Sequence, residues 1–392
     1  MKTLGVVTAT RAEYGLLRPV IREFRSREDA GFRMELIVTG THLSDAYGMT
    51  VREITERIDH RISVPVDCAD ERDIAADQAQ TLIAFTELFM KERYDAVMLL
   101  GDRYELLSVA IAAANTGTPI FHLCGGDTTE GAMDEWIRHS ITKMSYLHFV
   151  TSEESRKRVI RLGEDPERVF DYGSTSLDNV REYADMSRAD ALESAGLPDL
   201  PYALCTYHPV TMEKTGPDGQ MQVLFEVIKA YPSMLFVFTK SNADQGGDRI
   251  NSMLDEAAER IPNLRVFASL GVRRYLSLMR YAEFVLGNSS SGIIEAPMLH
   301  VPTVNIGDRQ KGRLQAASII NCEPTENAVN SAIEKALSRD FRDRCRDVVS
   351  PYGEGHPAEK IADRTLKVLM NESIDLKKAF YDLSETEVFR SG

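Results

Sequence analysis

Residues 95–107 read DAVMLLGDRYELL, a short apolar run that ends in a glycine and passes into charged residues and a helical pattern. A continuous apolar run of this length, bounded by a turn residue, is typical of a strand that is buried on both faces. The same order of apolar strand, polar or glycine-containing loop and longer helical segment recurs along the 392-residue chain. This alternation is the pattern of stacked βαβ units, so the sequence predicts an α/β fold with parallel sheets.

The predicted strands fall into two series. The segment between the series, residues 171–201, contains stretches rich in Gly, Pro and Ser that are typical of a linker. We therefore predict two doubly wound, Rossmann-like domains, residues 1–175 and 176–372, which face a cleft and bind their ligand outside the carboxyl ends of the strands. A further break at residues 351–357 precedes two predicted helices. The predicted strands are 3–8, 33–38, 95–100, 119–123 and 147–150, then 202–206, 234–239, 264–267, 284–286 and 303–306.

Composition narrows the classes of function. The chain has 46 basic and 60 acidic residues, a net charge of −14, which opposes binding to nucleic acid or to an anionic membrane surface. Its apolar runs are shorter than the ~20 residues that span a bilayer, and its first residues read as a strand and not as a signal peptide. The five cysteines are scattered, which fits neither a disulfide framework nor a structural zinc site. We therefore expect a cytoplasmic protein that binds neither nucleic acid nor membranes.

Two motifs in the first half place charged side chains at the ends of predicted strands. Residues 10–15, TRAEYG, begin a helix, where backbone N–H groups and Arg11 can face an anion. Residues 101–105, GDRYE, bring Asp102 and Arg103 to the carboxyl edge of the sheet, where catalytic groups gather in this architecture. Each motif also fits a plain helix cap, so these two motifs leave both interpretations open.

The stretch richest in chemistry is residues 122–139, HLCGGDTTEGAMDEWIRH, in one strand-to-helix connection. Three explanations compete: a metal site, a nucleophile site built on Cys124, and an acid/base site made of carboxylates. The histidines lack the spacing of a metal site, and a cysteine after a buried strand is usually a packed thiol. Crowded carboxylates suit acid/base chemistry, because like charges raise one pKa and keep one group protonated near neutral pH. We favour the acid/base site and expect no metal.

The second half carries three further motifs. His208 follows the strand 202–206, at the mouth of the expected cleft. Residues 286–295, LGNSSSGIIE, join a strand to a helix through a hydroxyl-rich turn, which suits a phosphate or diphosphate, with Glu295 placed for a ribose diol. Residues 305–313, NIGDRQKGR, add two arginines for a diphosphate. A serine-capped helix without a ligand is the alternative. Without a P-loop or a clean GxGxxG motif, ATP hydrolysis and NAD chemistry have no support, and we expect no cofactor.

Taken in order, these motifs resemble those of the hydrolysing UDP-N-acetylglucosamine 2-epimerases, and the resemblance runs to about residue 315. It implies a GT-B-like fold, in which two Rossmann-like domains close on a nucleotide sugar, with a final helix over residues 373–392 packing back on the first domain. It also implies a homodimer. The implied reaction converts UDP-N-acetylglucosamine (UDP-GlcNAc) and water to N-acetylmannosamine and UDP, the entry step to sialic acid.

The implied reaction needs carboxylates on opposite faces of the sugar. The C2 proton is not next to a carbonyl, so its removal must be coupled to departure of UDP, which leaves a 2-acetamidoglucal. Water then adds at C1, and a proton returns to C2 on the other face. Hydroxyls and arginines stabilise the leaving diphosphate.

The resemblance assigns roles to single residues. Asp102 and Asp134 match acidic residues regarded as catalytic, and His208 matches a histidine of the second domain. This chain has Cys124 where some relatives have a glutamate, and we expect Asp127 to replace that carboxylate, with two further acids in reserve. The reserve acids are Glu130 and Glu135, and the implied substrate and nucleotide contacts are Arg11, Ala12, Arg103, Ser289, Ser290, Ser291, Glu295 and Arg309.

The choice of substrate stays open. Relatives with this third motif also act on GDP-GlcNAc or on UDP-2,4-diacetamido-2,4,6-trideoxyglucose, on the route to legionaminic acid. Non-hydrolysing epimerases resemble the chain in fold but read His-Val-Glu-Ala-Gly at the third motif. The same fold serves glycosyltransferases, which need an acceptor groove and few acids around C2. A nucleotide-sugar sensor would have no use for Asp102 and Asp134 together.

Overall fold

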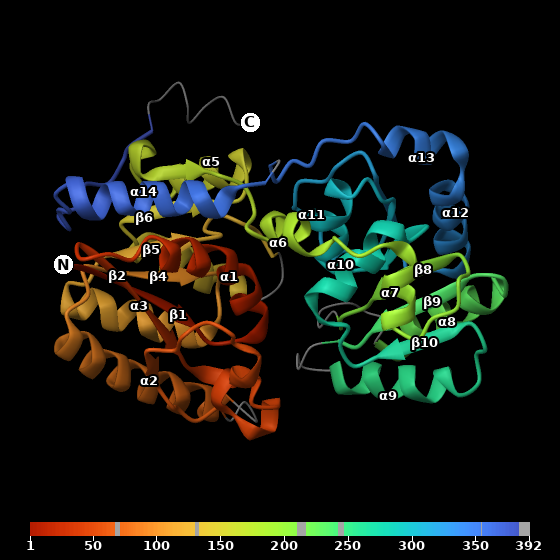
Figure 1. The fold of residues 1–392 in the computed structure, drawn as a ribbon, viewed down its shortest axis with the longest axis horizontal. Coiled ribbons are helices and arrows are strands. Elements are labelled where there is room, and N and C mark those ends of the chain that lie inside the picture. Colours follow the sequence, from red (N-terminus) through yellow and green to blue (C-terminus); the bar gives the residue numbers. More distant parts are fainter. Residues whose placement is uncertain (67–70, 130–132, 210–216, 242–246, 354, 384–392) are drawn as a thin grey trace. The chain divides into compact units, whose positions relative to one another are not determined.

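The computed structural model describes residues 1–66, 71–129, 133–209, 217–241, 247–353 and 355–383 (Figure 1). They belong to two compact units, and each unit is built on its own parallel sheet. The first unit takes its residues from Met1–Thr128, Ala132–Thr175 and Gly355–Gly392, and the second from Thr129–Gly131 and Ser176–Glu354. The two parallel sheets confirm the predicted α/β class. No helix in the described part of the chain is long and apolar enough to cross a membrane.

The sheet of the first unit has seven strands in the order β3-β2-β1-β4-β5-β6-β7. All its pairs are parallel, and in their register Val6 of β1 lies opposite Leu36 of β2 and Met98 of β4. The carboxyl ends of the strands therefore share one edge. The strands are β1 (Lys2–Thr8), β2 (Phe32–Val38), β3 (His60–Arg61), β4 (Ala96–Leu100), β5 (Ile120–Leu123), β6 (Leu147–Val150) and β7 (Val169–Asp171).

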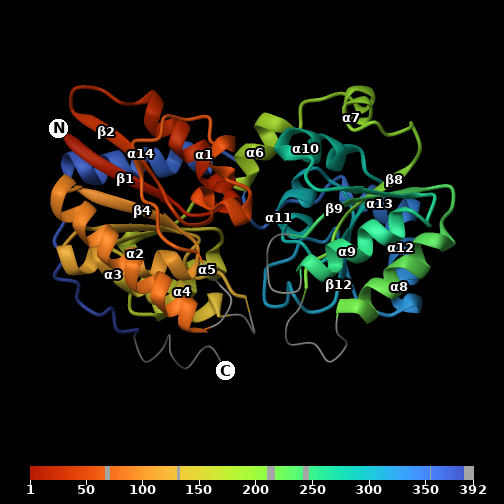
Figure 2. The same ribbon diagram turned by 90° about the horizontal axis from the view of Figure 1, so that it is seen from below.

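Helices cover both faces of this sheet (Figure 2). Leu4 and Val6 of β1 pack in one apolar cluster with α1 and α14, and Val7 packs in another with α2, α3 and α4. Burial on both faces explains why these strands read as continuous apolar runs. The helices are α1 (Arg11–Ser26), α2 (Glu71–Glu92), α3 (Tyr104–Thr116), α4 (Asp134–Met144), α5 (Glu153–Arg161) and α14 (Pro357–Asn371), with short 3-10 turns η1 (Gly40–Leu43), η2 (Asp45–Tyr47), η3 (Thr50–Glu53) and η4 (Pro166–Arg168).

The second unit repeats the architecture with six parallel strands in the order β10-β9-β8-β11-β12-β13. Figure 2 shows α7 and α10 on one side of this sheet and α8, α9 and α12 on the other. The strands are β8 (Tyr202–Thr206), β9 (Leu235–Thr239), β10 (Leu264–Phe267), β11 (Phe284–Gly287), β12 (Thr303–Ile306) and β13 (Ile319–Cys322). The helices are α6 (Ser176–Tyr183), α7 (Arg188–Ser194), α8 (Pro217–Ala230), α9 (Gly247–Ala258), α10 (Gly271–Tyr281), α11 (Ser291–Met298), α12 (Glu326–Leu337) and α13 (Arg339–Cys345).

The chain returns to the first unit earlier than the sequence predicts. The first unit resumes at Gly355, not at residue 373, and the returning helix is α14, while residues 373–383 form no helix. Pro357 occupies the first turn of α14, where its missing N–H is tolerated. The buried side chains of α14 recur at helical spacing, from Ala358 and Ile361 to Val368, and they join the apolar cluster of α1. Of the two helices predicted after residue 357, the described residues contain this one.

Gly287 allows the two central strands of the second unit to approach closely. Its φ is +133°, and a Cβ added there would lie 2.0 Å from the carbonyl oxygen of Thr206 at the end of β8. Real Cβ atoms do not approach so closely, so any side chain would force β11 away from β8.

We therefore predict that Gly287→Ala lowers the free energy of unfolding by about 2 kcal/mol or more, through backbone strain and strand displacement. Urea unfolding followed by circular dichroism measures the loss. Gly219→Ala is the matched control, because a Cβ at Gly219 in α8 meets nothing within 4 Å. Equal unfolding midpoints for Gly287→Ala and the unmodified chain would contradict the close approach.

Candidate functional site

A buried arginine organises the acidic stretch of the first unit. Arg138 lies in α4 with 3% of its side chain exposed. Its guanidinium donates to the Asp102 carboxylate, to Glu135 Oε2 at 3.0 Å and to the backbone oxygen of Asp127 at 2.7 Å. Burial by itself would lower the pKa of Arg138, but the charges of Asp102 and the neighbouring acids raise it above its usual value. One cation therefore joins the loop after β4, the loop after β5 and the start of α4.

Asp127 fixes the loop after β5 to the next strand. Its Oδ1 accepts hydrogen bonds from the hydroxyls of Thr151 at 2.6 Å and Ser155 at 2.7 Å. Gly126, just before it, has φ +78°, and a Cβ there would lie 2.3 Å from the backbone oxygen of Ser155. The loop thus packs tightly against the start of α5. The prediction that Asp127 replaces a catalytic glutamate stays a prediction.

Asp134 and the two reserve acids have different positions. Asp134 is the first residue of α4 and is half-buried, at a helix N-terminus that favours a negative charge. Glu135 contacts two residues of its own helix: its Oε1 lies 3.2 Å from His139 Nε2, and its Oε2 accepts from Arg138. Glu135 therefore orders the start of α4. Glu130 lies outside the described residues.

His122 holds the turn that carries Asp102. Its ring is fully buried and lies 2.8 Å through Nε2 from the carbonyl oxygen of Gly101 and 3.2 Å through Nδ1 from the Thr142 hydroxyl. Burial lowers the pKa of His122 to about 3, so the ring is neutral at neutral pH. Because a carbonyl only accepts, Nε2 carries the hydrogen and donates to Gly101. The motif alone indicates no role for His122. The structure shows that it holds the Gly101 turn.

The first motif contains a buried acid that sequence reasoning missed. Glu13 is 6% exposed, and its Oε2 accepts from the backbone N–H groups of Ala9 at 2.8 Å and Thr10 at 3.2 Å. Thr10 in return caps the N–H of Glu13, which is the capping box that the T-x-x-E spacing encodes. Burial, with smaller contributions from neighbouring carboxylates, raises the pKa of Glu13 to about 8. An acid with a raised pKa is therefore present in the first motif as well as the acids expected in the third.

Arg11, Ala12 and Arg103 lie at the same sheet edge. Arg11 and Ala12 form the exposed first turn of α1, and the Arg11 guanidinium is 3.9 Å from Glu53. Arg103 occupies the N-cap position of α3 and pairs with Glu105 at 3.4 Å, whereas Asp102 beside it pairs with Arg138. Adjacent residues of one motif thus have different partners.

In the second unit, the side chain of Asn288 connects the predicted residues. It is fully buried and makes two bonds to His208, accepting from the backbone N–H at 2.7 Å and donating to the carbonyl at 2.8 Å. The backbone oxygen of Asn288 accepts from Arg309 at 3.1 Å and from Gln310 at 2.8 Å. The structure therefore brings together the loops after β8, β11 and β12. Sequence reasoning quoted Asn288 in its motif but gave it no role.

His208 is a neutral imidazole in this arrangement. It is 7% exposed, and its Nδ1 lies 3.0 Å from the Ser241 hydroxyl. Burial, and to a smaller extent the charge of Arg309, lowers the pKa of His208 to about 3. At neutral pH the ring can therefore donate or accept a hydrogen bond but carries no charge.

The serine turn begins α11. Ser289 Oγ accepts from the backbone N–H of Ser291 at 3.4 Å, Ser290 takes the N-cap position, and the Ser291 hydroxyl accepts from Tyr275 at 3.0 Å. Glu295, one turn later, has a buried Oε2 without a hydrogen-bond partner among the described residues, and burial raises its pKa. This turn therefore offers hydroxyls, a helix N-terminus and an open acceptor.

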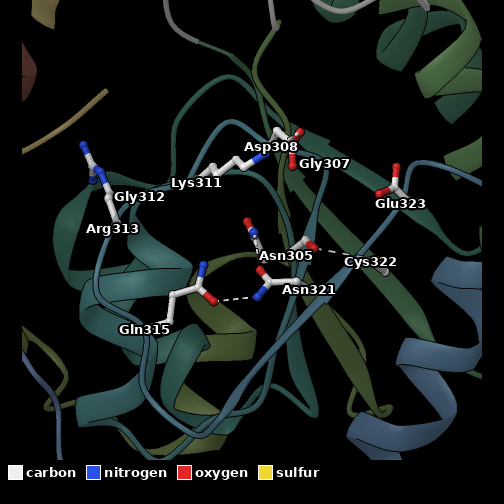
Figure 3. A pocket seen from close by; sticks show the side chains of 10 residues that line it. All are labelled: Asn305, Gly307, Asp308, Lys311, Gly312, Arg313, Gln315, Asn321, Cys322 and Glu323. Atoms are coloured by element: carbon white, nitrogen blue, oxygen red, sulfur yellow. Dashed lines mark hydrogen bonds and ion pairs between the residues drawn. The ribbon is translucent and has the colours of Figure 1, made fainter. Parts of the chain in front are cut away.

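The loop that carries Arg309 also borders a hollow of about 510 Å³ beyond the ends of β12 and β13 (Figure 3). In this hollow the amide of Asn305 donates to Asn321 at 2.8 Å. Arg313, the second arginine predicted for a diphosphate, lines this hollow, whereas the residues to which the resemblance assigns roles do not. Within the described ranges, no group of three or more His, Cys, Asp or Glu side chains is placed to hold a metal ion. The lining residues are Asn305, Gly307, Asp308, Lys311, Gly312, Arg313, Gln315, Asn321, Cys322 and Glu323.

Comparison with known proteins gives consistent matches. A family model described as UDP-N-acetylglucosamine 2-epimerase matches residues 25–366. The GDP/UDP-N,N'-diacetylbacillosamine 2-epimerase (hydrolyzing) of Campylobacter jejuni is 37% identical over 97% of this chain and 99% of its own. The UDP-N,N'-diacetylbacillosamine 2-epimerase (hydrolyzing) of Legionella pneumophila is 36% identical over 85% of this chain and 88% of its own.

A solved structure has the same fold. The UDP-GlcNAc 2-epimerase of Neisseria meningitidis, solved with UDP-GlcNAc bound, superposes with a TM-score of 0.71 at 18% identity, over 94% of this chain and 100% of that chain. The superposition confirms the predicted GT-B-like fold.

The geometry of Asn288 predicts a large effect on stability. Asn288→Ala leaves two buried backbone groups of His208 unpaired, and at about 1–3 kcal/mol for each group we expect a loss of roughly 2–6 kcal/mol in the free energy of unfolding. Asn321→Ala is the control, because Asn321 also bonds through its amide but is exposed. Urea unfolding compares the two variants. Similar midpoints would show that the two hydrogen bonds from the Asn288 side chain to the His208 backbone are not formed.

Proposed function

Because the chain belongs to the UDP-N-acetylglucosamine 2-epimerase family, we propose that it is a hydrolysing nucleotide-sugar 2-epimerase, which releases a free 2-epimerised amino sugar and UDP. The observation that carries the proposal is the acidic cluster around Arg138, which holds the Asp102 carboxylate at the carboxyl end of the sheet. Such a cluster suits proton transfer at carbon. The relatives from Campylobacter and Legionella, both described as hydrolyzing, support the use of water.

Two substrates follow from the relatives. The Campylobacter and Legionella proteins are named for nucleotide-linked N,N'-diacetylbacillosamine, which is 2,4-diacetamido-2,4,6-trideoxyglucose. A UDP-N-acetylglucosamine 2-epimerase of Neisseria meningitidis is 31% identical over 86% of this chain. The higher identity favours the UDP-linked diacetamido sugar, with N-acetylmannosamine formation from UDP-GlcNAc as the second candidate.

In the proposed mechanism, the first unit acts on the sugar. A carboxylate, Asp102 or Asp134, takes the C2 proton as the bond from C1 to the diphosphate oxygen breaks, and the C2–H electrons form the C1–C2 double bond of the glycal. Water then adds its oxygen to C1 and gives one proton to a carboxylate, while a second acid delivers a proton to C2 on the opposite face. Asp127 is the proposed third acid, and its two hydroxyl bonds hold it in place.

The second unit takes the nucleotide in this proposal. The hydroxyls of Ser289 and Ser290 at the start of α11, with the Arg309 guanidinium, stabilise the charge of the leaving diphosphate. The neutral His208 donates a hydrogen bond without adding charge. The open Oε2 of Glu295 accepts from the ribose hydroxyls. A glycosyltransferase would use the same turn, but the acids around Arg138 favour epimerisation.

Proton NMR in deuterated water tests the reaction with UDP-GlcNAc, GDP-GlcNAc and UDP-N,N'-diacetylbacillosamine. We expect a free sugar with the inverted C2 centre, deuterated at C2, together with free UDP. A nucleotide-linked product would show non-hydrolysing chemistry, and no turnover of the three sugars would favour the transferase.

Substitutions separate the two halves of the proposal. Asp102→Asn and Asp134→Asn should each lower kcat by about 10²-fold or more, because a lost acid/base group costs this much, and should leave UDP affinity nearly unchanged. Asp95→Asn is the control, because Asp95 precedes the amino end of β4 and its side chain is 28% exposed against 25% for Asp102. Loss of UDP binding in either variant would place these acids at the nucleotide.

Arg309→Ala should weaken UDP binding about 10- to 100-fold, since charge-assisted hydrogen bonds contribute ~1.5–3 kcal/mol. Lys311→Ala is the control, because it removes a cation from the same loop. The Lys311 side chain is 65% exposed and lies 3.6 Å from Asp308, and the proposal gives it no contact with UDP. Isothermal calorimetry with UDP measures both affinities. Equal affinities would remove Arg309 from the nucleotide site.

A further inference from the structure

Two buried carboxyl groups and one guanidinium follow the carboxyl ends of β1 and β4. Glu13 begins α1 in the first motif, and Arg103 and Glu105 belong to the second. Glu13 is 6% exposed and Glu105 is 1% exposed. Three buried atoms of this group have no hydrogen-bond partner among the described residues: Glu13 Oε1, Glu105 Oε2 and Arg103 Nε. The mechanism above uses neither glutamate.

Each carboxyl group has one satisfied oxygen and one open oxygen. Glu13 Oε2 accepts from two backbone N–H groups, those of Ala9 and Thr10, and Glu105 Oε1 accepts from Arg103 at 3.4 Å. A neutral Glu13 keeps its carbonyl oxygen as the acceptor at Oε2 and gains a hydroxyl donor at Oε1. Protonation of Glu13 therefore supplies a donor at its open oxygen.

The charges around Glu13 favour the neutral form. The ionisable groups that act on it are Glu105, Arg103 and Asp102, and of these Asp102 already pairs with Arg138. Within the described part of the chain, Arg103 is the one cation of this group: it pairs with Glu105, and both glutamates act on it. Two ionised glutamates would leave a net buried negative charge, which a buried site disfavours.

Other titratable groups on the neighbouring elements do not supply a second cation. Arg11 on α1 is exposed and faces Glu53 on η3. His42 on η1 is buried against Thr8, and burial lowers its pKa to about 4, so it is neutral. The pKa of Glu13, raised to about 8 by burial and then by Glu105, agrees with this charge count.

We propose that Glu13 is a positioning residue held as a neutral acid, while Arg103 keeps Glu105 as its partner. The proton on Glu13 leaves it bonded to the backbone after β1, at the start of the helix that carries Arg11. Its effect on turnover rests on the proposed function, whereas the proton itself does not.

The proposal has a defined pH dependence. The pKa of Glu13 in the folded chain is raised from 4.5 to about 8, so the folded state binds this proton more tightly than the unfolded state. The stabilisation is full below about 4.5 and is lost as the pH rises through about 8. A side chain that imitates the neutral acid but does not titrate should therefore make the chain more stable, relative to the unmodified chain, as the pH rises.

Urea unfolding at pH 5, 6, 7 and 8 tests this with Glu13→Gln and Glu13→Ala. The glutamine amide reproduces the neutral acid, because its oxygen accepts from the two backbone N–H groups and its NH₂ donates. We expect the midpoint of Glu13→Gln to rise relative to the unmodified chain at each step from pH 5 to 8, and that of Glu13→Ala to be lower than Glu13→Gln throughout. A difference that does not change with pH, or equal losses in the two variants, would overturn the proposal.

Glu164→Gln is the matched control, because it removes a buried glutamate with the opposite environment. Glu164 is 1% exposed and bonds to Lys143, His148 and Lys378, which lower its pKa to about 2 despite burial. Its stabilisation is lost only at acid pH, as the pH falls through about 2, so the Glu164→Gln difference should stay nearly constant from pH 5 to 8.

Turnover gives a second readout that a purely structural role would not move. With the substrate found by NMR, kcat/KM of the unmodified chain should fall above about pH 8, and Glu13→Gln should extend activity to higher pH while Glu13→Ala raises KM. An unchanged alkaline limb in Glu13→Gln would overturn the positioning role. If none of the sugars is turned over, the proposed reaction fails, and the unfolding data still decide whether the proton is present.

Discussion

The buried guanidinium of Arg138 is the interaction on which the acidic site of the first unit depends. A side chain only 3% exposed cannot leave its charge unpaired, because a broken buried pair costs about 3–5 kcal/mol. Its N–H groups instead go to a carboxylate after β4, a backbone oxygen after β5 and a carboxylate of α4. The need to neutralise one cation therefore brings three separate segments together and orients Asp102.

In the second unit, a neutral side chain joins three loops in place of a buried cation. The side-chain amide of Asn288 forms hydrogen bonds with the backbone N–H and carbonyl of His208. The backbone oxygen of Asn288 accepts hydrogen bonds from Arg309 and Gln310. Uncharged donors and a helix N-terminus suit an anion such as a diphosphate, whereas paired carboxylates suit proton transfer. The two units thus differ in chemistry although they share an architecture.

The ten predicted strands all exist, because strands buried on both faces read as continuous apolar runs. The missed strands β3, β7 and β13 are edge strands; β3 and β7 have only two and three residues, and β13 has a single buried residue, so none of them reads as a buried apolar run. The candidate site also has a part that the sequence predicts and a part that it does not. Motif spacing located Asp102 and the serine turn, but the partners of Arg138 and the burial of Glu13 depend on contacts between segments far apart in sequence. Local pattern carries no information on those contacts.

Environment, and not residue type, separates the acids at the end of β4. Asp102 is 25% exposed and faces a buried cation, so its negative charge has both solvent and a partner. Glu13 is 6% exposed, and Glu105 competes with it for the one guanidinium, so burial dominates and raises its pKa. Two carboxyl groups at one sheet edge thus have different surroundings, since Asp102 faces a cation of its own and Glu13 does not. Because Arg103 pairs with Glu105 and keeps part of its side chain exposed, a neutral Glu13 leaves that exposed part more attractive to an anion.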